Sequence, residues 1–193
     1  MDVQPVTLEG RIARLLPLQE DHAEALTRHA DRDMLQYTFF PGTGKVEDSL
    51  KAIRQVIAAP DYCPFAVEYR ETGEIIGTTS YMDIRAAHRG LEIGSTWYAQ
   101  AYHGSPVNPE CKFMLLRHAF EELGAIRVQL KTDLRNIQSQ RAIEKLGAVK
   151  EGILRKHIVM PDGYFRDTVM YSITYDEWAD VKIRLEKRLG YVP

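Results

Sequence analysis

The chain has 193 residues, a length typical of one ordinary domain that can bury a core without help from a metal or a disulfide. With 25 basic and 27 acidic side chains the net charge is -2, so composition gives no reason to expect nucleic acid or an anionic membrane as the main partner. Hydrophobic residues make up 45% and charged residues 27%, which is the profile of a globular protein.

The first half of the chain predicts a strand, two helices and then three strands. The expected strands are residues 6–17, 65–69, 75–84 and 91–98. The expected helices are residues 19–30 and 46–59. A turn at residues 71–74 joins two of the strands into a hairpin. Residues 41–44 read Pro-Gly-Thr-Gly, so they predict a loop between the two helices.

The second half of the chain alternates between helices and strands. The expected helices are residues 109–123, 136–146 and 178–189. The expected strands are residues 126–132, 148–159 and 164–175. The last two strands form a hairpin around Pro161-Asp162-Gly163. This order predicts a mixed α/β (α+β) sheet with helices on its faces, in a single domain spanning residues 1–193.

The cysteines and the apolar runs indicate where the protein is found. Cys63 and Cys111 do not have metal-ligand spacing, and nothing supports a disulfide between them. No apolar run approaches the length of a membrane span, and residues 1–10 lack the layout of a signal peptide. We therefore expect a soluble, cytoplasmic protein with reduced cysteines, no bound metal, and neither membrane nor nucleic acid as a partner.

A glycine-containing loop precedes the helix expected at residues 109–123. Asn108 is expected to cap this helix, with Pro109 at its first position. Gly104 lies in the loop that leads into it. The start of a helix presents unpaired N–H groups and the positive end of the helix dipole, which suits an anion such as a pyrophosphate. One glycine and a cap are equally consistent with an ordinary surface helix.

Asn136 and Ser139 lie three residues apart, so they share one face of the next helix. They follow the end of a strand, where ligands commonly bind in open sheets. The pair could therefore contact a polar ligand. The alternative is that Asn136 or the nearby Asp133 only caps the helix.

Several stretches of the chain share the pattern of one enzyme family. They are the opening Leu8 to Leu18, Leu91-Glu92-Ile93-Gly94 with Trp97, Asp133-x-x-Asn136-x-x-Ser139 with Glu144-Lys145-Leu146-Gly147, and the end from Gly163-x-x-Arg166-Asp167 to Ser172. Together they resemble the GNAT superfamily of N-acetyltransferases, in the branch that contains the ribosomal-protein alanine N-acetyltransferases. The resemblance covers nearly the whole chain, and the expected order of elements agrees with it.

The resemblance implies a mixed, mostly antiparallel central sheet that splays open in the middle and holds acetyl-CoA in the splay. The strand at residues 94–98 would pair through its backbone with the pantetheine arm, and residues 103–108 would hold the pyrophosphate. The cofactor contacts implied are Trp97, Tyr98, Gly104, Ser105, Val107, Asn108, Asn136 and Ser139. A homodimer is a further expectation of the family.

Two positions depart from the family pattern. The usual phosphate loop reads Gln/Arg-x-x-Gly-x-Gly/Ala, whereas residues 103–108 read His-Gly-Ser-Pro-Val-Asn, and Pro106 has no N–H to donate. Many members carry a tyrosine seven residues after the asparagine, proposed to protonate the leaving thiolate. Ile143 occupies that position here, so Ser139 is the nearest candidate by analogy.

Acetyl transfer to an amine requires a neutral amine, a polarised thioester and a proton for the thiolate. Direct attack by the amine needs no enzyme nucleophile, and no Ser/His/Asp arrangement is evident. The expected catalytic residues are Glu92, Ser139 and Asn136. Glu92 is the candidate base, and strand alternation places it on one face with Gly94 and Thr96. Alternatively, Glu92 is a structural residue paired with a basic neighbour such as Arg89.

The remaining candidates are aromatic residues and histidines. Tyr37, Phe39 and Phe40 are expected either to line the acceptor site or to belong to the core. His88, His103 and His157 are isolated, and each is expected to be a surface or packing residue rather than a base.

These observations predict an enzyme that moves the acetyl group of acetyl-CoA to a primary amine, on a protein N-terminus or a small molecule, by direct attack in a ternary complex. One alternative is a detoxifying N-acetyltransferase for an amine antibiotic or an amino-acid analogue. Another is an acyl-CoA-binding module without catalysis, which the changed phosphate loop and Ile143 keep open.

Overall fold

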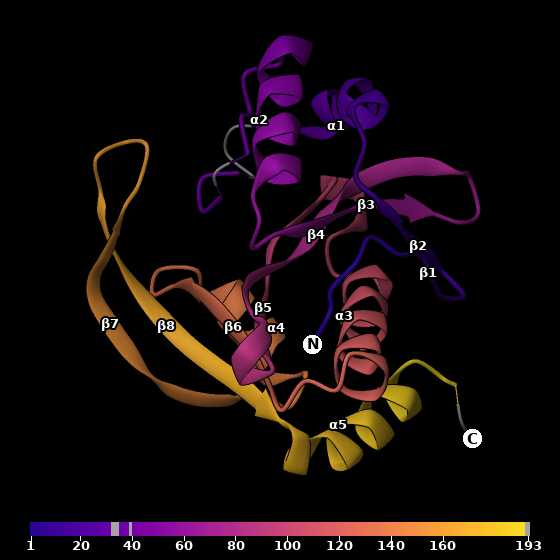
Figure 1. Ribbon diagram of the computed structural model, residues 1–193. Coiled ribbons are helices and arrows are strands. Elements are labelled where there is room, and N and C mark those ends of the chain that lie inside the picture. The colour runs from indigo at the N-terminus through magenta and orange to yellow at the C-terminus, as the bar shows by residue number, and fades with distance from the viewer. Residues whose placement is uncertain (32–34, 39, 192–193) are drawn as a thin grey trace.

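The computed structural model of the chain describes residues 1–31, 35–38 and 40–191. At its centre is an eight-stranded sheet in the order β1-β2-β3-β4-β5-β6-β8-β7 (Figure 1). The strands are β1 (Leu8–Glu9), β2 (Ala13–Pro17), β3 (Cys63–Tyr69), β4 (Glu74–Arg85), β5 (Gly90–Tyr98), β6 (Arg127–Asp133), β7 (Val149–Val159) and β8 (Phe165–Thr174). Neighbouring strands pair antiparallel, apart from the parallel pair β5 and β6.

Helices cover both faces of the sheet (Figure 1). They are α1 (Ala23–His29), α2 (Val46–Ala58), α3 (Val107–Arg117), α4 (Ile137–Glu144) and α5 (Tyr175–Arg188). Buried side chains of α1 and α2 pack with Ala66 and Trp97 on one face. Those of α3, α4 and α5 pack with Val128 and Leu130 on the other face. The predicted mixed, mostly antiparallel sheet with helices on both faces is therefore confirmed.

The sheet opens between β5 and β6. These strands pair only through residues 90–92 of β5 and 127–129 of β6. Beyond this point β5 continues beside β4 alone, while β6 continues beside β8 alone. The two halves of the sheet therefore part, as the family resemblance implies.

A β-bulge interrupts β5 just beyond the opening. Thr78 pairs with Trp97 and Ser80 with Gly94, so Ser95 and Thr96 together oppose one residue, and Ser95 has a φ of 47°. The extra residue reverses the side-chain alternation after Gly94. Thr96 therefore turns toward α3, and the expectation that it shares a face with Glu92 is wrong.

The N-terminal strand expected at residues 6–17 is instead two short strands, β1 and β2, joined by a turn at residues 10–12. The carboxylate of Glu110 in α3 accepts hydrogen bonds from the N–H groups of Arg11, Ile12 and Ala13 at 2.7–2.9 Å. This carboxylate holds the turn, because backbone N–H groups that leave a strand ladder need other acceptors.

Two helix starts also differ from expectation. The helix α3 begins at Val107, and Asn108 lies within its first turn, so the expected Asn108 cap is wrong. Its N-cap residue is Pro106, which makes no side-chain capping bond. At the other end, α5 begins at Tyr175 rather than at Trp178, because Thr174 and Glu177 form a capping box.

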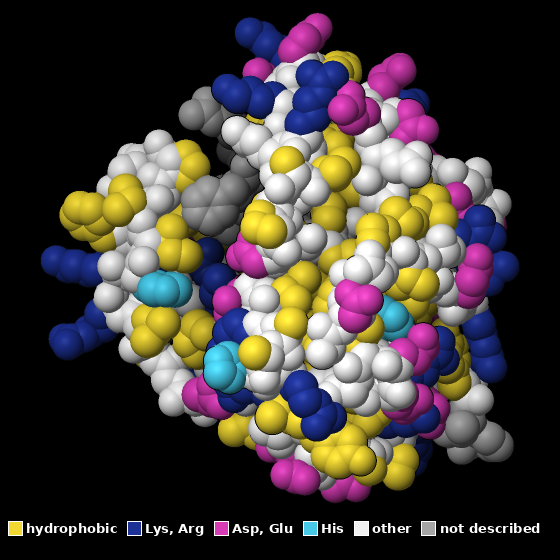
Figure 2. All heavy atoms as spheres, in the orientation of Figure 1, with side chains coloured by type: hydrophobic (Ala, Val, Ile, Leu, Met, Phe, Trp, Pro, Cys, Tyr) yellow, Lys and Arg dark blue, Asp and Glu magenta, His cyan; other side chains and the backbone are white. Residues whose placement is uncertain are grey.

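The hairpin of β7 and β8 extends away from the rest of the sheet (Figure 1). Apolar and basic side chains gather on it in the space-filling view (Figure 2), and the exposed apolar ones are Val149, Ile153, Leu154, Val159 and Phe165. No helix in the described part of the chain is long and apolar enough to cross a membrane.

Candidate active site in the sheet opening

A cavity of about 1120 Å³ occupies the opening of the sheet. Its walls come from β5, the loop before α3, α4, β6, β8 and the segment after α1. The cavity reaches both faces of the sheet because β5 and β6 no longer pair there. Its volume is large for a single small-molecule site, so it can hold a cofactor arm and an acceptor together.

The loop before α3 forms one end of the cavity. Gly104 has a φ of 76°, in the left-handed region that favours glycine, and the space around it is open. Of the four expected phosphate donors, two are already engaged: Ser105 N–H donates to Tyr102 O, and Val107 N–H to the Ser105 hydroxyl. Within the described residues the N–H groups of Gly104 and Asn108 have no acceptor, so these two remain available.

The end of β5 is tied to the first turn of α3. The Tyr98 hydroxyl donates to Asn108 Oδ1 at 3.2 Å, and burial raises the pKa of Tyr98 well above its ordinary value. The Asn108 side chain is thus an acceptor for Tyr98 instead of a helix cap. Trp97 points to the opposite face, where its ring lies 4.9 Å from that of Phe40.

Asn136 and Ser139 both line the cavity. Asn136 is the N-cap of α4, and its Oδ1 accepts the Ser139 N–H at 2.9 Å. Asn136 therefore caps the helix, and because it also lines the cavity, its contact with a ligand stays a prediction. Ile143 lies one turn further along the same wall, and its side chain has no proton to donate.

Glu92 is a buried carboxylate that lines the cavity and is 1% exposed. Its Oε2 accepts from Lys131 Nζ and from Gln129 Nε2, both at 3.0 Å. Lys131 is therefore its cationic partner, and the expected pairing with Arg89 is wrong because Arg89 Nε donates to Gly124 O. Among the described residues nothing donates to Oε1, so one oxygen is held and the other is free.

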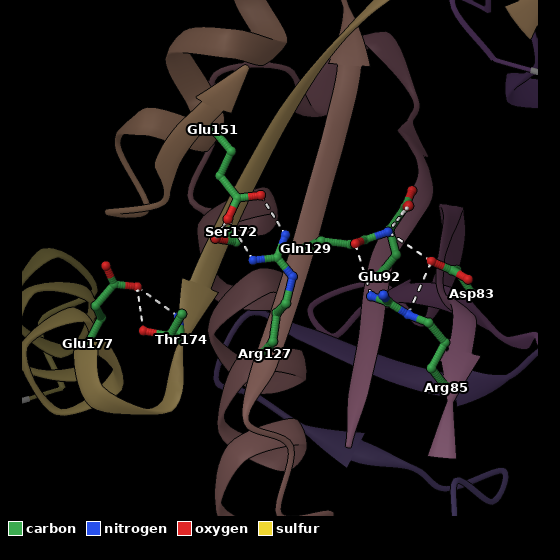
Figure 3. Close-up of polar contacts among 9 residues, drawn as sticks. All are labelled: Asp83, Arg85, Glu92, Arg127, Gln129, Glu151, Ser172, Thr174 and Glu177. Carbon is green, nitrogen blue, oxygen red and sulfur yellow. Dashed lines mark hydrogen bonds and ion pairs between the residues drawn. The ribbon is translucent and has the colours of Figure 1, made fainter. Parts of the chain in front are cut away.

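Two further features hold the Glu92 carboxylate in place. Gln129 also donates to Asp83 Oδ2 and accepts from Arg85, so its amide is fixed from two sides (Figure 3). Gly94 leaves room, because a Cβ there would come within 2.9 Å of Glu92 Oε1. The glycine of the Leu91-Glu92-Ile93-Gly94 motif thus accommodates the carboxylate two residues before it.

Lys112 is a cavity residue that sequence reasoning missed. It lies on α3, is 6% exposed, and donates from Nζ to Thr96 Oγ1 at 2.6 Å and to Thr79 Oγ1 at 3.3 Å. No carboxylate of the described residues pairs with it, and burial lowers its pKa to about 8. A lysine inside a helix ordinarily reaches solvent, but α3 is buried on every side from Cys111 to Leu116.

Two of the three candidate aromatic residues line the cavity. They are Tyr37 and Phe40, and Phe40 also belongs to the core beneath α1 and α2. Phe39 lies outside the described residues. His103 lines the cavity as well, and its Nε2 is 2.9 Å from Tyr98 O, which makes it a packing residue of the loop.

A metal centre is not assembled in the part of the chain that the structure describes. No three side chains of His, Cys, Asp or Glu come together there in a way that could hold an ion. Cys63 and Cys111 are both free, and burial raises their thiol pKa to about 11 and about 12. Both thiols are therefore protonated near neutral pH.

Residues 13–149 match the family model described as Acetyltransferase (GNAT) domain. YdaF of Bacillus subtilis (strain 168), a candidate ribosomal N-acetyltransferase by name, is 30% identical over 57% of this chain, and the match spans only 59% of YdaF. A crystal structure of an acetyltransferase candidate from T. thermophilus is 43% identical, covers 98% of this chain and 100% of its own, and superposes with a TM-score of 0.91.

A more distant structure shares the fold. It is Mycobacterium smegmatis RimJ in complex with CoA-disulfide, at 22% identity, 95% coverage of both chains and a TM-score of 0.83. The family match covers well over half of the chain, and the splayed sheet is the one that the resemblance implied. The chain therefore belongs to the GNAT acetyltransferase family.

Proposed function

We propose that this acetyltransferase moves the acetyl group of acetyl-CoA to a primary amine, by direct attack within a ternary complex, in one domain spanning residues 1–193. The observation that carries the proposal is the opening between β5 and β6. It joins the two faces of the sheet, so a donor bound on the α3 and α4 side can meet an acceptor bound on the α1 and α2 side.

The cofactor side of the cavity suits the arm of acetyl-CoA. Beyond Glu92, one edge of β5 is free of strand pairing, so the backbone of residues 94–98 can bind pantetheine amides. The available N–H groups of Gly104 and Asn108 lie at the start of α3, where the helix dipole favours a pyrophosphate. The CoA compound bound by RimJ, which shares this fold, supports the assignment.

The reaction needs two proton transfers. The amine nitrogen attacks the thioester carbon, the C–S bond breaks, the nitrogen loses a proton and the sulfur gains one. In the proposal Glu92 Oε1 takes the amine proton, directly or through water, because Lys131 and Gln129 occupy only Oε2. The Ser139 hydroxyl gives a proton to the thiolate, and Asn136 positions Ser139 by capping its N–H.

Turnover tests the proposal. Acetyl-CoA is incubated with the protein and a panel of amines: N-terminal peptides, amino acids, amino-acid analogues and aminoglycosides. Thiol release and acetylated product are then measured together. We expect amine-dependent thiol release above a control without amine. A protein that binds acetyl-CoA in calorimetry but releases no thiol with any amine would instead be a non-catalytic acyl-CoA-binding module.

A further inference from the structure

A buried arginine faces the cavity without a partner among the residues that the structure describes. Arg166 lies on β8, is 5% exposed and lines the cavity. No described residue accepts a hydrogen bond from its guanidinium or forms an ion pair with it, and its Nε is buried and unsatisfied. Burial lowers the pKa of Arg166, but a guanidinium remains charged at neutral pH. Burying a charge without a partner lowers the stability of the fold, and a bound anion would offset this cost.

The pairing of β6 with β8 shows which face Arg166 occupies. Opposite residues of an antiparallel pair share a face, and Lys131 pairs with Met170 while Asp133 pairs with Thr168. By alternation along β8, Arg166 lies on that same face. Tyr171 points the other way and donates to Glu144 of α4. Arg166 therefore lies across the sheet from α3 and α4, away from the proposed cofactor side.

Two carboxylates that act electrostatically on Arg166 are already paired with other cations. Asp133 accepts from Arg135 through both oxygens, at 3.1 Å and 2.9 Å. Glu92 is held by Lys131. Both carboxylates still act on Arg166 by raising its pKa, so they lie within electrostatic reach of it.

The ion pairs around Arg166 leave its own charge for an anionic ligand. Two neighbouring cations are already paired, Lys131 with Glu92 and Arg135 with Asp133, whereas the described residues provide no partner for the guanidinium of Arg166. A guanidinium binds a carboxylate through two parallel hydrogen bonds.

We infer that Arg166 binds a carboxylate of the acceptor, so that the preferred amine substrate carries a carboxylate near its amino group. The inference rests on the proposed function, because it assigns the acceptor to the face that holds Glu92. Such a carboxylate comes either from a free amino acid or its analogue, or from an acidic residue near the N-terminus of a peptide.

This inference can be tested with pairs of acceptor amines that differ only in the presence of the carboxylate. One arm compares free amino acids with their amides, and a second compares Ala-Asp with Ala-Asn tetrapeptide amides. We expect the wild-type kcat/KM to favour the acid member by at least tenfold in one arm, which identifies the source of the carboxylate. The acid-to-amide ratio should fall toward one in Arg166→Gln and partly return in Arg166→Lys.

The controls separate the inference from the proposed function. Arg155→Gln removes an exposed arginine from the neighbouring strand β7 and should keep the wild-type ratio. Turnover of amines without an acid preference, or a ratio that Arg166→Gln leaves unchanged in a folded protein, overturns the inference and leaves the proposed function standing. No turnover with any amine overturns both. Equal losses on acid and amide would make Arg166 structural and would also overturn the inference.

Discussion

Two charged residues of α3, two positions apart, have opposite environments. Glu110 is fully buried, and its carboxylate accepts three backbone N–H groups and the Tyr191 hydroxyl. Lys112 is also buried, but it has only two threonine hydroxyls as partners and faces the cavity. A buried charge with every bond satisfied belongs to the scaffold. A buried charge that has few hydrogen-bond partners and lies beside a cavity indicates a ligand-binding site.

The same contrast separates two regions of the molecule. Around Glu110, polar groups join the β1–β2 turn, α3 and the chain after α5 into one satisfied network. Around the sheet opening, some polar groups have no partner in the described part of the chain: one oxygen of Glu92, the guanidinium of Arg166 and the N–H of Gly104. Changes in the first region should alter stability, and changes in the second should alter ligand binding and turnover.

Glu110→Ala should break the scaffold and give the largest effect. Removal of the carboxylate leaves the N–H groups of half-buried Ile12 and buried Ala13 without their acceptor. We expect a loss of about 3–5 kcal/mol of unfolding free energy. Thermal and urea unfolding measure it, with the exposed Glu24→Ala as control. A variant as stable as that control would mean that the turn does not depend on Glu110.

Lys112→Met should change how the free energy of unfolding depends on pH. Burial lowers the pKa of Lys112 from 10.5 to about 8, so between these values the unfolded chain binds more protons than the folded one. Relative to Lys112→Met, the wild type should therefore gain stability as pH rises from about 8 to 10.5. The total gain is about 3 kcal/mol relative to Lys112→Met, from a shift worth about 1.4 kcal/mol per pKa unit.

Urea unfolding of both proteins at pH 7.0 and 10.5 measures this difference. Below pH 8 the variant should be the more stable protein, because the cost of burying the ammonium is absent. The neighbouring Cys111 thiol, whose pKa burial raises from 9.0 to about 12, lowers the stability of both proteins in this window, so its effect cancels in the comparison. Parallel stability curves for the two proteins would show that Lys112 is not a strained cation.

Glu92→Gln should act on turnover more than on folding. The substitution keeps the shape of the side chain but removes its basicity, so kcat/KM at neutral pH should fall by about a hundredfold. Activity should recover as pH rises and more of the amine is neutral. Asp83→Asn is the matched control, since it changes the same Gln129 network outside the cavity wall. A fully active Glu92→Gln enzyme, or a loss confined to melting temperature, would place Glu92 in the scaffold.

Gly104→Asp should give the smallest effect, on cofactor affinity alone. The position is open and left-handed, so a side chain there meets strain and an added charge opposes the phosphates. Gly104→Asn carries the same strain without the charge and serves as the control. We expect acetyl-CoA to bind about tenfold more weakly to the Asp variant than to the Asn variant in calorimetry. Equal affinities would move the pyrophosphate away from this loop.

Helix and strand positions were predictable because they follow from local periodicity. The helix α2 and the strands β3 to β6 lie within a few residues of their predicted ranges. The errors arise where distant groups intervene. Residues 6–17 divide into two strands because a carboxylate about a hundred positions later binds the turn. Asn108 loses its expected capping role because Tyr98, on the preceding strand, uses its oxygen.

The candidate site was predictable only where a motif or a capping pattern marked it. The residues expected at the cofactor, such as Gly104, Asn136 and Ser139, do line one cavity. Their roles remain predictions. Lys112 carried no such mark. Arg166 lies in the motif at the end of the chain, but nothing in that motif indicated burial, because a lysine in a helix and an arginine in a strand are ordinarily surface residues.

The sequence by itself determined the family, the order of elements and the presence of a helix start and a strand end suited to a cofactor. These depend on periodicity, caps and short motifs, all of which act over a few residues. Tertiary structure alone decided which charged side chains have hydrogen-bond or ion-pair partners. Burial and pairing of Glu92, Lys112 and Arg166 arise from strands and helices that meet across long sequence separations, and desolvation depends on everything packed around a group.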